Sequence, residues 1–260
     1  MDNFKRLQRN STFCFSCQKE YSCFNQCCTD TNIFLTPYDV LRIRRHLKIS
    51  SEEFLEKYSI QPFTKDQKLP VVLLKLLDDK QRHCPFVRAD GCSIYEDRPW
   101  SCRMYPIGLA SQKTRIDDPR NEFFFLQSDD FCEGHASKQE WTIDAWVQNQ
   151  GVEPYEYFST LFREIVLHPA FEKGQDLTPP KMEMFHMVFY NLDKFRSFIF
   201  ESSFLKRFEI GKNTLKKIKN DDLELMRFGV DWLKFCLFAE NTIKIRGEVS
   251  ENEMAEAESS

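Results

Sequence analysis

Cysteine is the residue type in this sequence best suited to chemistry, and eight of the ten cysteines gather in the N-terminal part of the chain, beside turn-forming residues. Thiolates that converge within about 2.3 Å of one point hold a metal ion, and loops can arrange this where long helices cannot. An all-thiolate set suits zinc or an iron–sulfur cluster rather than magnesium or calcium. The candidate metal ligands are Cys17, Cys23, Cys27, Cys28, Cys84, Cys92, Cys102 and Cys132.

Whether the clustered cysteines are metal ligands or form disulfides depends on the redox conditions of the compartment in which the protein resides. The first twelve residues are polar and basic and lack the apolar run of a signal peptide, and no stretch approaches eighteen uninterrupted apolar residues. We therefore expect a cytoplasmic protein without a membrane span, whose clustered, reduced cysteines bind metal or act as catalytic thiols. Disulfides are the alternative. A net charge of -4 gives no reason to expect a nucleic-acid partner.

The adjacent pair Cys27-Cys28 leaves the number of centres open. Neighbouring side chains of an extended segment point to opposite sides, so both thiols reach one ion only in a tight turn. Otherwise they serve two centres, or one of them is structural. Eight cysteines allow two four-cysteine sites or one site with spare thiols.

Two arginines flank Cys102 and are candidate cofactor-binding residues. Four thiolates around a divalent ion leave net negative charge, which Arg98 and Arg103 would offset. The alternative is that Arg98 pairs with Glu96 or Asp97 on the surface. The five histidines share no ligand spacing with the cysteines, and Cys14 and Cys236 stand outside the constellation.

Helices and short strands must position these loops. Thr36-Pro37 is a helix start, with threonine as N-cap and proline at the first helical position. Ser50 to Glu53 forms a capping box for a second helix. The apolar runs 71–77 and 123–126 predict strands, and 142–150, closed by glycine 151, predicts a helix.

The sequence pattern of the C-terminal part predicts helices only. Apolar spacing predicts helices over 154–167 and 181–200, and Asp221-Asp222 caps a last helix to about residue 239. We therefore predict an α+β fold: a small cysteine-rich metal-binding module with few short strands over residues 1–150, then a mainly helical region over 151–246. The acidic tail, 247–260, has almost nothing to bury and is expected to be disordered.

Several short motifs follow one another along the first half of the chain. They are Cys17-x5-Cys23-x3-Cys27-Cys28, Leu35-Thr36-Pro37-Tyr38-Asp39-Val40, Cys84-Pro85-Phe86, Gly91-Cys92-Ser93-Ile94-Tyr95, Arg98-Pro99 and Cys102-Arg103-Met104-Tyr105-Pro106. Together they resemble a known family, the YkgJ-type cysteine-cluster proteins, described as a zinc- or iron-chelating domain. The resemblance covers about residues 15–135. The usual opening is Cys-x2-Cys-x2-Cys-Cys, and the longer spacing here leaves open whether Cys17 or Cys23 takes the first position.

The resemblance implies a metal-binding protein with zinc or an iron–sulfur cluster as cofactor. Flagellin lysine N-methylase has a similar cysteine cluster, so the alternative is an iron–sulfur enzyme that modifies a protein substrate. No Gly-x-Gly-x-x-Gly nucleotide loop is present, so methyl transfer rests on the resemblance alone. A third interpretation is a protein partner docked on the phenylalanine-rich helices, although such a stripe is more often core.

Overall fold

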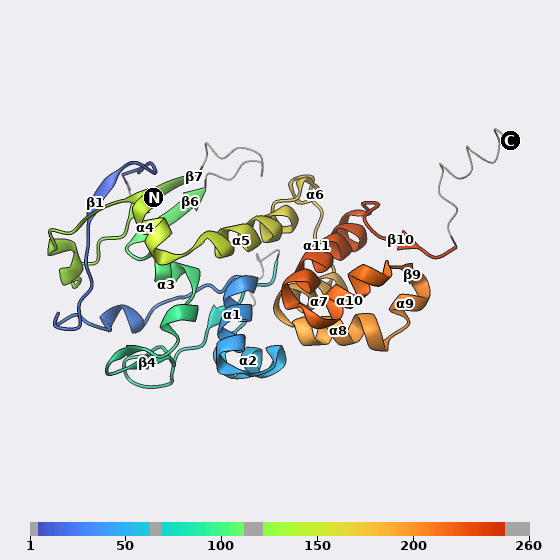
Figure 1. The fold of residues 1–260 in the computed structure, drawn as a ribbon, viewed down its shortest axis with the longest axis horizontal. Coiled ribbons are helices and arrows are strands. Elements are labelled where there is room, and N and C mark those ends of the chain that lie inside the picture. The colour runs from blue at the N-terminus through green and yellow to red at the C-terminus, as the bar shows by residue number, and fades with distance from the viewer. Residues whose placement is uncertain (1–4, 63–68, 112–121, 248–260) are drawn as a thin grey trace. The chain divides into compact units, whose positions relative to one another are not determined.

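The computed structural model describes residues 5–62, 69–111 and 122–247 and divides the chain into two compact units, Met1–Asp176 and Leu177–Ser260 (Figure 1). The predicted α+β class is confirmed, because short strands and cysteine-bearing loops fill the first unit and helices dominate the second. The predicted boundary between two domains after residue 150 stays a prediction. The helix that follows this boundary, Glu153–Val166, belongs to the first compact unit. The predicted acidic tail lies outside the described residues, apart from Gly247.

The helices of the first unit begin where the sequence predicts caps. The α1 helix carries a full capping box between Thr36 and Asp39, and Ser50 caps α2 through the Glu53 amide. Thr142 caps α4, and Gly151 ends it with a positive φ of 59°. Helix α1 packs against α5, and α3 against α4. The helices are α1 (Pro37–Leu47), α2 (Ser51–Tyr58), α3 (Trp100–Met104), α4 (Ile143–Gln150), α5 (Glu153–Val166) and α6 (Pro169–Glu172).

The described strands of the first unit form antiparallel pairs. The predicted strand at 123–126 is confirmed as β7, which pairs with β6. The run 71–77 pairs over only two residues. After this pair the Lys75 amide donates to the carbonyl of Tyr58, at the end of α2, and the Leu77 amide donates to the His83 carbonyl. The pairs are β1 (Thr12–Cys14) with β8 (Glu140–Thr142), β2 (Ser59–Ile60) with β3 (Leu73–Leu74), β4 (Val87–Arg88) with β5 (Gly91–Cys92), and β6 (Ile107–Ser111) with β7 (Glu122–Leu126).

An apolar core holds β1, β6, β7, α3 and α4 together and lies next to the cysteine loops. Its residues include Phe15, two positions before Cys17, and Met104, two positions after Cys102. Cys132 packs against the same core. The Trp146 indole N–H donates to the Met104 carbonyl at 3.0 Å, so α4 is fixed to the end of α3. The fold therefore anchors three cysteine segments to one core.

The second unit is built from aromatic packing between helices. Phe204 packs edge-on against Trp232 with ring centroids 4.9 Å apart. The prediction of one helix over 181–200 is wrong: the backbone leaves helical geometry at Asn191 (φ −116°, ψ 70°), whose side chain caps the next helix through the Lys194 amide. The elements are α7 (Pro179–Tyr190), α8 (Leu192–Glu201), α9 (Phe204–Arg207), β9 (Phe208–Glu209), α10 (Lys212–Asn220), α11 (Asp222–Phe238) and β10 (Lys244–Ile245).

None of the helices in the described part of the chain combines the length and apolar character needed to cross a membrane.

Candidate metal centre

The loop that carries the first four cysteines is fastened at both ends to other cysteine segments. Near its start, the Ser16 amide donates to the Gly134 carbonyl at 3.2 Å. At its end, the Cys84 amide donates to the Cys28 carbonyl at 2.8 Å. Between these points the chain turns through the short 3-10 helix η1 (Gln26–Cys28), after Asn25 in the left-handed conformation. Segments distant in sequence thus meet around this loop.

The segment from Cys84 to Cys102 is folded back on itself. Val87 pairs with Cys92 in the β4–β5 hairpin, and the Val87 amide donates to the Cys84 carbonyl at 3.2 Å. Gly91 permits the hairpin turn with a φ of 124°, a conformation that L side chains rarely adopt. Backbone pairing therefore brings Cys84 and Cys92 to the same end of this hairpin.

Asp39 fixes the start of the helix that carries Cys102. Its carboxylate is fully buried and accepts the Trp100 amide at 2.8 Å, while its other oxygen accepts the Thr36 amide and hydroxyl at 2.7 Å. Burial raises the pKa of Asp39 to about 6, and the hydrogen bonds from Thr36 and Trp100 act against that rise. Sequence analysis identified Asp39 only as part of a helix start.

All ten cysteines are free thiols, so the disulfide alternative has no support in the structure. The Sγ atoms of Cys27 and Cys28 lie 4.0 Å apart. A hydrogen bond from Cys28 lowers the pKa of Cys27 to about 7, and the same bond, followed by burial, raises the pKa of Cys28. Cys23 is buried, and its Sγ accepts the Glu133 amide at 3.3 Å.

The remaining candidate thiols lie close enough for each to change the pKa of its neighbours by electrostatic repulsion. Burial raises the pKa of Cys102, and the neighbouring Cys84 is the next cause. Burial likewise raises the pKa of Cys17, and Cys27 is the next cause. Cys17 and Cys27 therefore lie near one another, as do Cys84 and Cys102, although Cys17, Cys27 and Cys102 each keep part of their surface exposed to solvent. A bound cation would offset the repulsion between their thiolates. This all-sulfur donor set fits zinc or an iron–sulfur cluster.

The thiols are gathered without being in coordination geometry. Across residues 5–62, 69–111 and 122–247, no three Cys, His, Asp or Glu side chains are grouped so that they could hold an ion as they stand. All eight candidates lie within these ranges. Cys14 lies exposed on β1, and Cys236 lies on α11 in the second unit, where burial raises its pKa to about 12.

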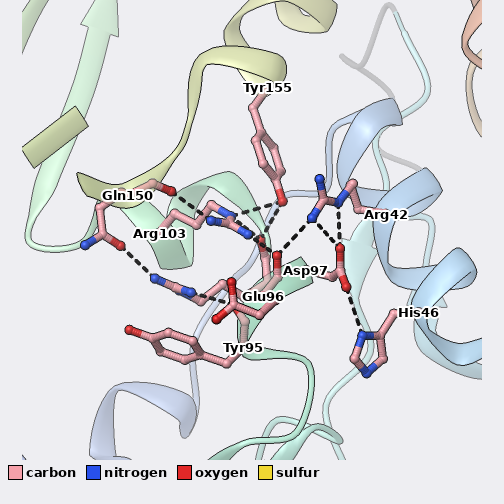
Figure 2. A network of polar contacts seen from close by, with 9 residues as sticks. Arg42, His46, Tyr95, Glu96, Asp97, Arg103, Gln150 and Tyr155 are labelled. Carbon is pink, nitrogen blue, oxygen red and sulfur yellow. Dashed lines mark hydrogen bonds and ion pairs between the residues drawn. The ribbon is translucent and has the colours of Figure 1, made fainter. Parts of the chain in front are cut away.

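Arg103 is nearly buried and binds carbonyl oxygens from several segments (Figure 2). Its guanidinium donates to the Gln150 carbonyl at 2.7 Å and to the Tyr155 hydroxyl at 3.0 Å. It also donates to the Arg98 and Glu96 carbonyls. Arg103 therefore ties the residues around Cys102 to α4 and α5. Gln150 and Tyr155 carry no sequence motif, so sequence analysis missed both.

Arg98 is also nearly buried, with its guanidinium 3.7 Å from the centre of the Tyr95 ring. It donates to the Gln150 side-chain oxygen at 2.6 Å. Burial lowers the pKa of Arg98, while the nearby Cys102 and Cys92 act in the opposite direction. The guanidinium thus packs against the Tyr95 ring and lies near two candidate ligands, Cys92 and Cys102.

The Asp97 carboxylate faces Arg42 and His46 (Figure 2). Arg42 Nε donates to Asp97 at 2.6 Å, and His46 Nδ1 lies 2.9 Å from the other carboxylate oxygen. Asp97 thus contacts Arg42 and His46, which differs from the surface pair with Arg98 that the sequence offered as an alternative. The His135 ring packs against the Phe15 and Tyr105 rings, which also contact each other. Its Nε2 atom is buried without a hydrogen-bond partner among the described residues.

Comparison with known proteins gives one match. Residues 16–133 match a family model described as "CxxCxxCC: Putative zinc- or iron-chelating domain". The resemblance found from the cysteine motifs is thereby confirmed. No curated protein and no solved structure matches the chain significantly.

Proposed function

We propose that this chain binds zinc through its clustered cysteines and that the metal is structural; the match of residues 16–133 to the model of the "Putative zinc- or iron-chelating domain" supports metal binding in general. The ligands are drawn from Cys17, Cys23, Cys27, Cys28, Cys84, Cys92, Cys102 and Cys132.

One observation carries this proposal: the cysteine loops have almost no core of their own. From Ser16 to Phe34 the only buried residue is Cys23, and from Lys75 to Ser93 the only one is Phe86. Segments that bury so little apolar surface gain little stability from packing. Structural zinc supplies folding energy to such segments by joining loops that would otherwise be loosely held.

The arginines beside Cys102 support the same role. Thiolates around zinc carry net negative charge, which the Arg98 guanidinium near Cys92 and Cys102 would offset. Arg103 acts through the backbone, since its donors are used on carbonyls and the Tyr155 hydroxyl. In this proposal Arg98 is a positioning and charge-balancing residue, and Arg103 holds the Cys102 segment in place.

The enzymatic alternative, modification of a protein substrate by an iron–sulfur enzyme, has no specific observation in its favour within the described part of the chain. It would require a cluster beside a substrate pocket. Metal content distinguishes the two interpretations directly.

The test is elemental and sulfide analysis of protein purified without oxygen, followed by limited proteolysis with and without a chelator. We expect a colourless protein with stoichiometric zinc, in which chelation makes 16–34 and 75–93 susceptible to cleavage. A brown protein that contains iron and sulfide would show that the metal is an iron–sulfur cluster rather than zinc. A metal-free protein with unchanged proteolysis would refute metal binding.

A further inference from the structure

We propose that the cysteine module holds two four-thiolate centres, the first formed by Cys17, Cys23, Cys27 and Cys132 and the second by Cys28, Cys84, Cys92 and Cys102. This inference rests on the metal-binding function proposed above and adds the number of centres and the ligands of each.

Backbone contacts fasten the first half of the N-terminal loop to the Cys132 segment. The Cys23 sulfur accepts the amide of Glu133, the residue after Cys132, at 3.3 Å. The Ser22 amide donates to the Glu133 carboxylate at 3.1 Å. Cys17 follows Ser16, whose amide bonds to Gly134. Cys132 and Cys23 are also among the thiols that raise the pKa of Cys17.

A separate set of contacts fastens the end of the loop to the β4–β5 hairpin. The Cys28 carbonyl accepts the Cys84 amide at 2.8 Å, and Thr29 and His83 form a β-bridge beside this bond. Cys92 lies opposite Val87 in the hairpin. Cys84 and Cys102 are among the neighbouring thiols that raise the pKa of Cys28. Four cysteines thus surround the hairpin without any contribution from the Cys132 segment.

The local helix separates the two adjacent thiols. Cys27 and Cys28 lie on the 3-10 helix η1, where successive side chains point about 120° apart because there are three residues per turn. Cys27 can therefore face one centre while Cys28 faces the other. Their sulfur atoms lie 4.0 Å apart, which is also close to the separation of about 3.8 Å between two thiolates on one zinc ion. The two centres would therefore be direct neighbours, and the experiments below decide whether the two thiols bind one ion or two.

Cys27 lies near residues of both groups, and its assignment follows from the four thiolates that each centre needs. The Asp129 carboxylate is among the charges that raise the pKa of Cys27, against the larger effect of the hydrogen bond from Cys28. Asp129 lies with Cys132, because its carbonyl accepts the Cys132 amide at 2.9 Å. Cys27 also lies near Cys92 and Cys102. Only assignment to the first group gives each centre four thiolates.

The charge around the two groups differs, and we expect their metal affinities to differ with it. Arg98 and Arg88 lie near Cys92, where their positive charge acts against the burial that raises its pKa. The second group also has the Asp39 carboxylate near Cys102. The first group has the carboxylates of Asp129 and Glu133 beside it, and no arginine of the described residues is among the leading causes that change the pKa of Cys17 or Cys27. Positive charge near a thiolate centre offsets its net negative charge. The first centre should therefore lose its metal at a lower chelator concentration.

The test combines zinc content per chain with mapping of alkylated cysteines by mass spectrometry. We expect two zinc ions per wild-type chain and one in either Cys132→Ser or Cys102→Ser. In Cys132→Ser, Cys27 should become alkylated while Cys28 stays protected; in Cys102→Ser the pattern should reverse. Cys14→Ser is the matched control, expected to keep both ions and the wild-type pattern.

Titration of the wild-type chain with chelator repeats the test without a variant that could fail to fold. Cys17, Cys23, Cys27 and Cys132 should become reactive in an earlier phase than the other four. One ion per chain, or simultaneous exposure of all eight thiols, would overturn the two-centre assignment while leaving metal binding intact. Absence of any metal from the wild-type chain would instead refute the proposed function. If iron and sulfide replace zinc, the alkylation pattern still decides the assignment.

Discussion

A single buried carboxylate, Asp39, joins the start of α1 to the start of α3 and so helps to place Cys102. The thiols themselves could be identified from the sequence, because cysteine clusters beside turn residues are visible there. The hydrogen bonds of Asp39 with Trp100 and of Arg103 with Tyr155 could not, because each joins residues more than fifty positions apart. Sequence patterns report neighbours within a few residues, and long-range polar contacts follow from the fold.

Asp39 predicts a pH dependence of stability. Burial raises its pKa to about 6 in the folded protein, against about 3.9 in an unfolded chain. Between these values the unfolded chain has released the proton while the folded protein retains it, so this residue makes stability fall as pH rises. The free energy of unfolding of wild type, minus that of Asp39→Asn, should fall from pH 4 to 6 and then level off.

Urea unfolding of both proteins across this range measures the difference, in which effects of acid on bound metal largely cancel. Asp144→Asn is the control, because Asp144 is half exposed in its pair with Arg9. A difference that rises with pH would mean that the donors around Asp39 favour its ionised form.

Arg103 predicts a large loss of stability on substitution. Arg103→Met would leave the Gln150 carbonyl and the Tyr155 hydroxyl without this donor, at a cost of about 3 kcal/mol. Arg103→Lys should recover only part of this stability, because an ammonium group cannot reproduce the planar arrangement of donors in the guanidinium. Arg9→Met, which removes a largely exposed ion pair, should cost about 0.5 kcal/mol or less. Chemical denaturation compares the three, and equal losses for Arg103→Met and Arg9→Met would contradict the proposed role.

At the scale of elements, sequence analysis succeeded where a local signal exists. Thr36, Ser50 and Asp221 cap helices as predicted, because a cap is satisfied within three residues. Thr142, predicted only as the start of a helix, also acts as a cap. The break at Asn191 was missed because apolar spacing continues from α7 into α8. The short helix α10 was missed because its sequence, KNTLKKIKN, is dominated by lysine and buries only Ile218.

Because the helix is interrupted at Asn191, the Asn191 side chain should stabilise the protein by capping the start of α8, which a continuous helix would not require. The Asn191 side chain accepts the Lys194 amide at 3.1 Å, so Asn191→Ala should destabilise the second unit by about 1 kcal/mol. Asn220→Ala is the matched control, because Asn220 bonds only to the Lys216 carbonyl on an exposed surface. Thermal unfolding followed by circular dichroism measures both. An unchanged or raised melting temperature for Asn191→Ala would show that the cap contributes nothing.

At the scale of the whole molecule, the two units are stabilised in different ways. The second unit buries aromatic rings that pack against one another, among them Phe204 and Trp232. The cysteine loops of the first unit bury almost nothing besides Cys23 and Phe86. The fold class could be predicted because this contrast is visible in the composition of the two parts. The convergence of the loops depends on backbone bonds such as that between Cys28 and Cys84, which no local pattern encodes.

This contrast predicts where metal removal acts. A ligand that binds only the folded form stabilises by mass action the part of the structure that it holds. Chelation should therefore raise amide hydrogen exchange in 16–34 and 75–93, where packing gives little protection. Helices α7 to α11 should keep their protection, because aromatic burial there involves none of the candidate ligands. Exchange measured by mass spectrometry with and without chelator tests this, with Cys236→Ser as a control expected to match wild type. Equal loss of protection in α7 to α11 would mean that the metal stabilises both units, and no change in either loop would mean that it stabilises neither.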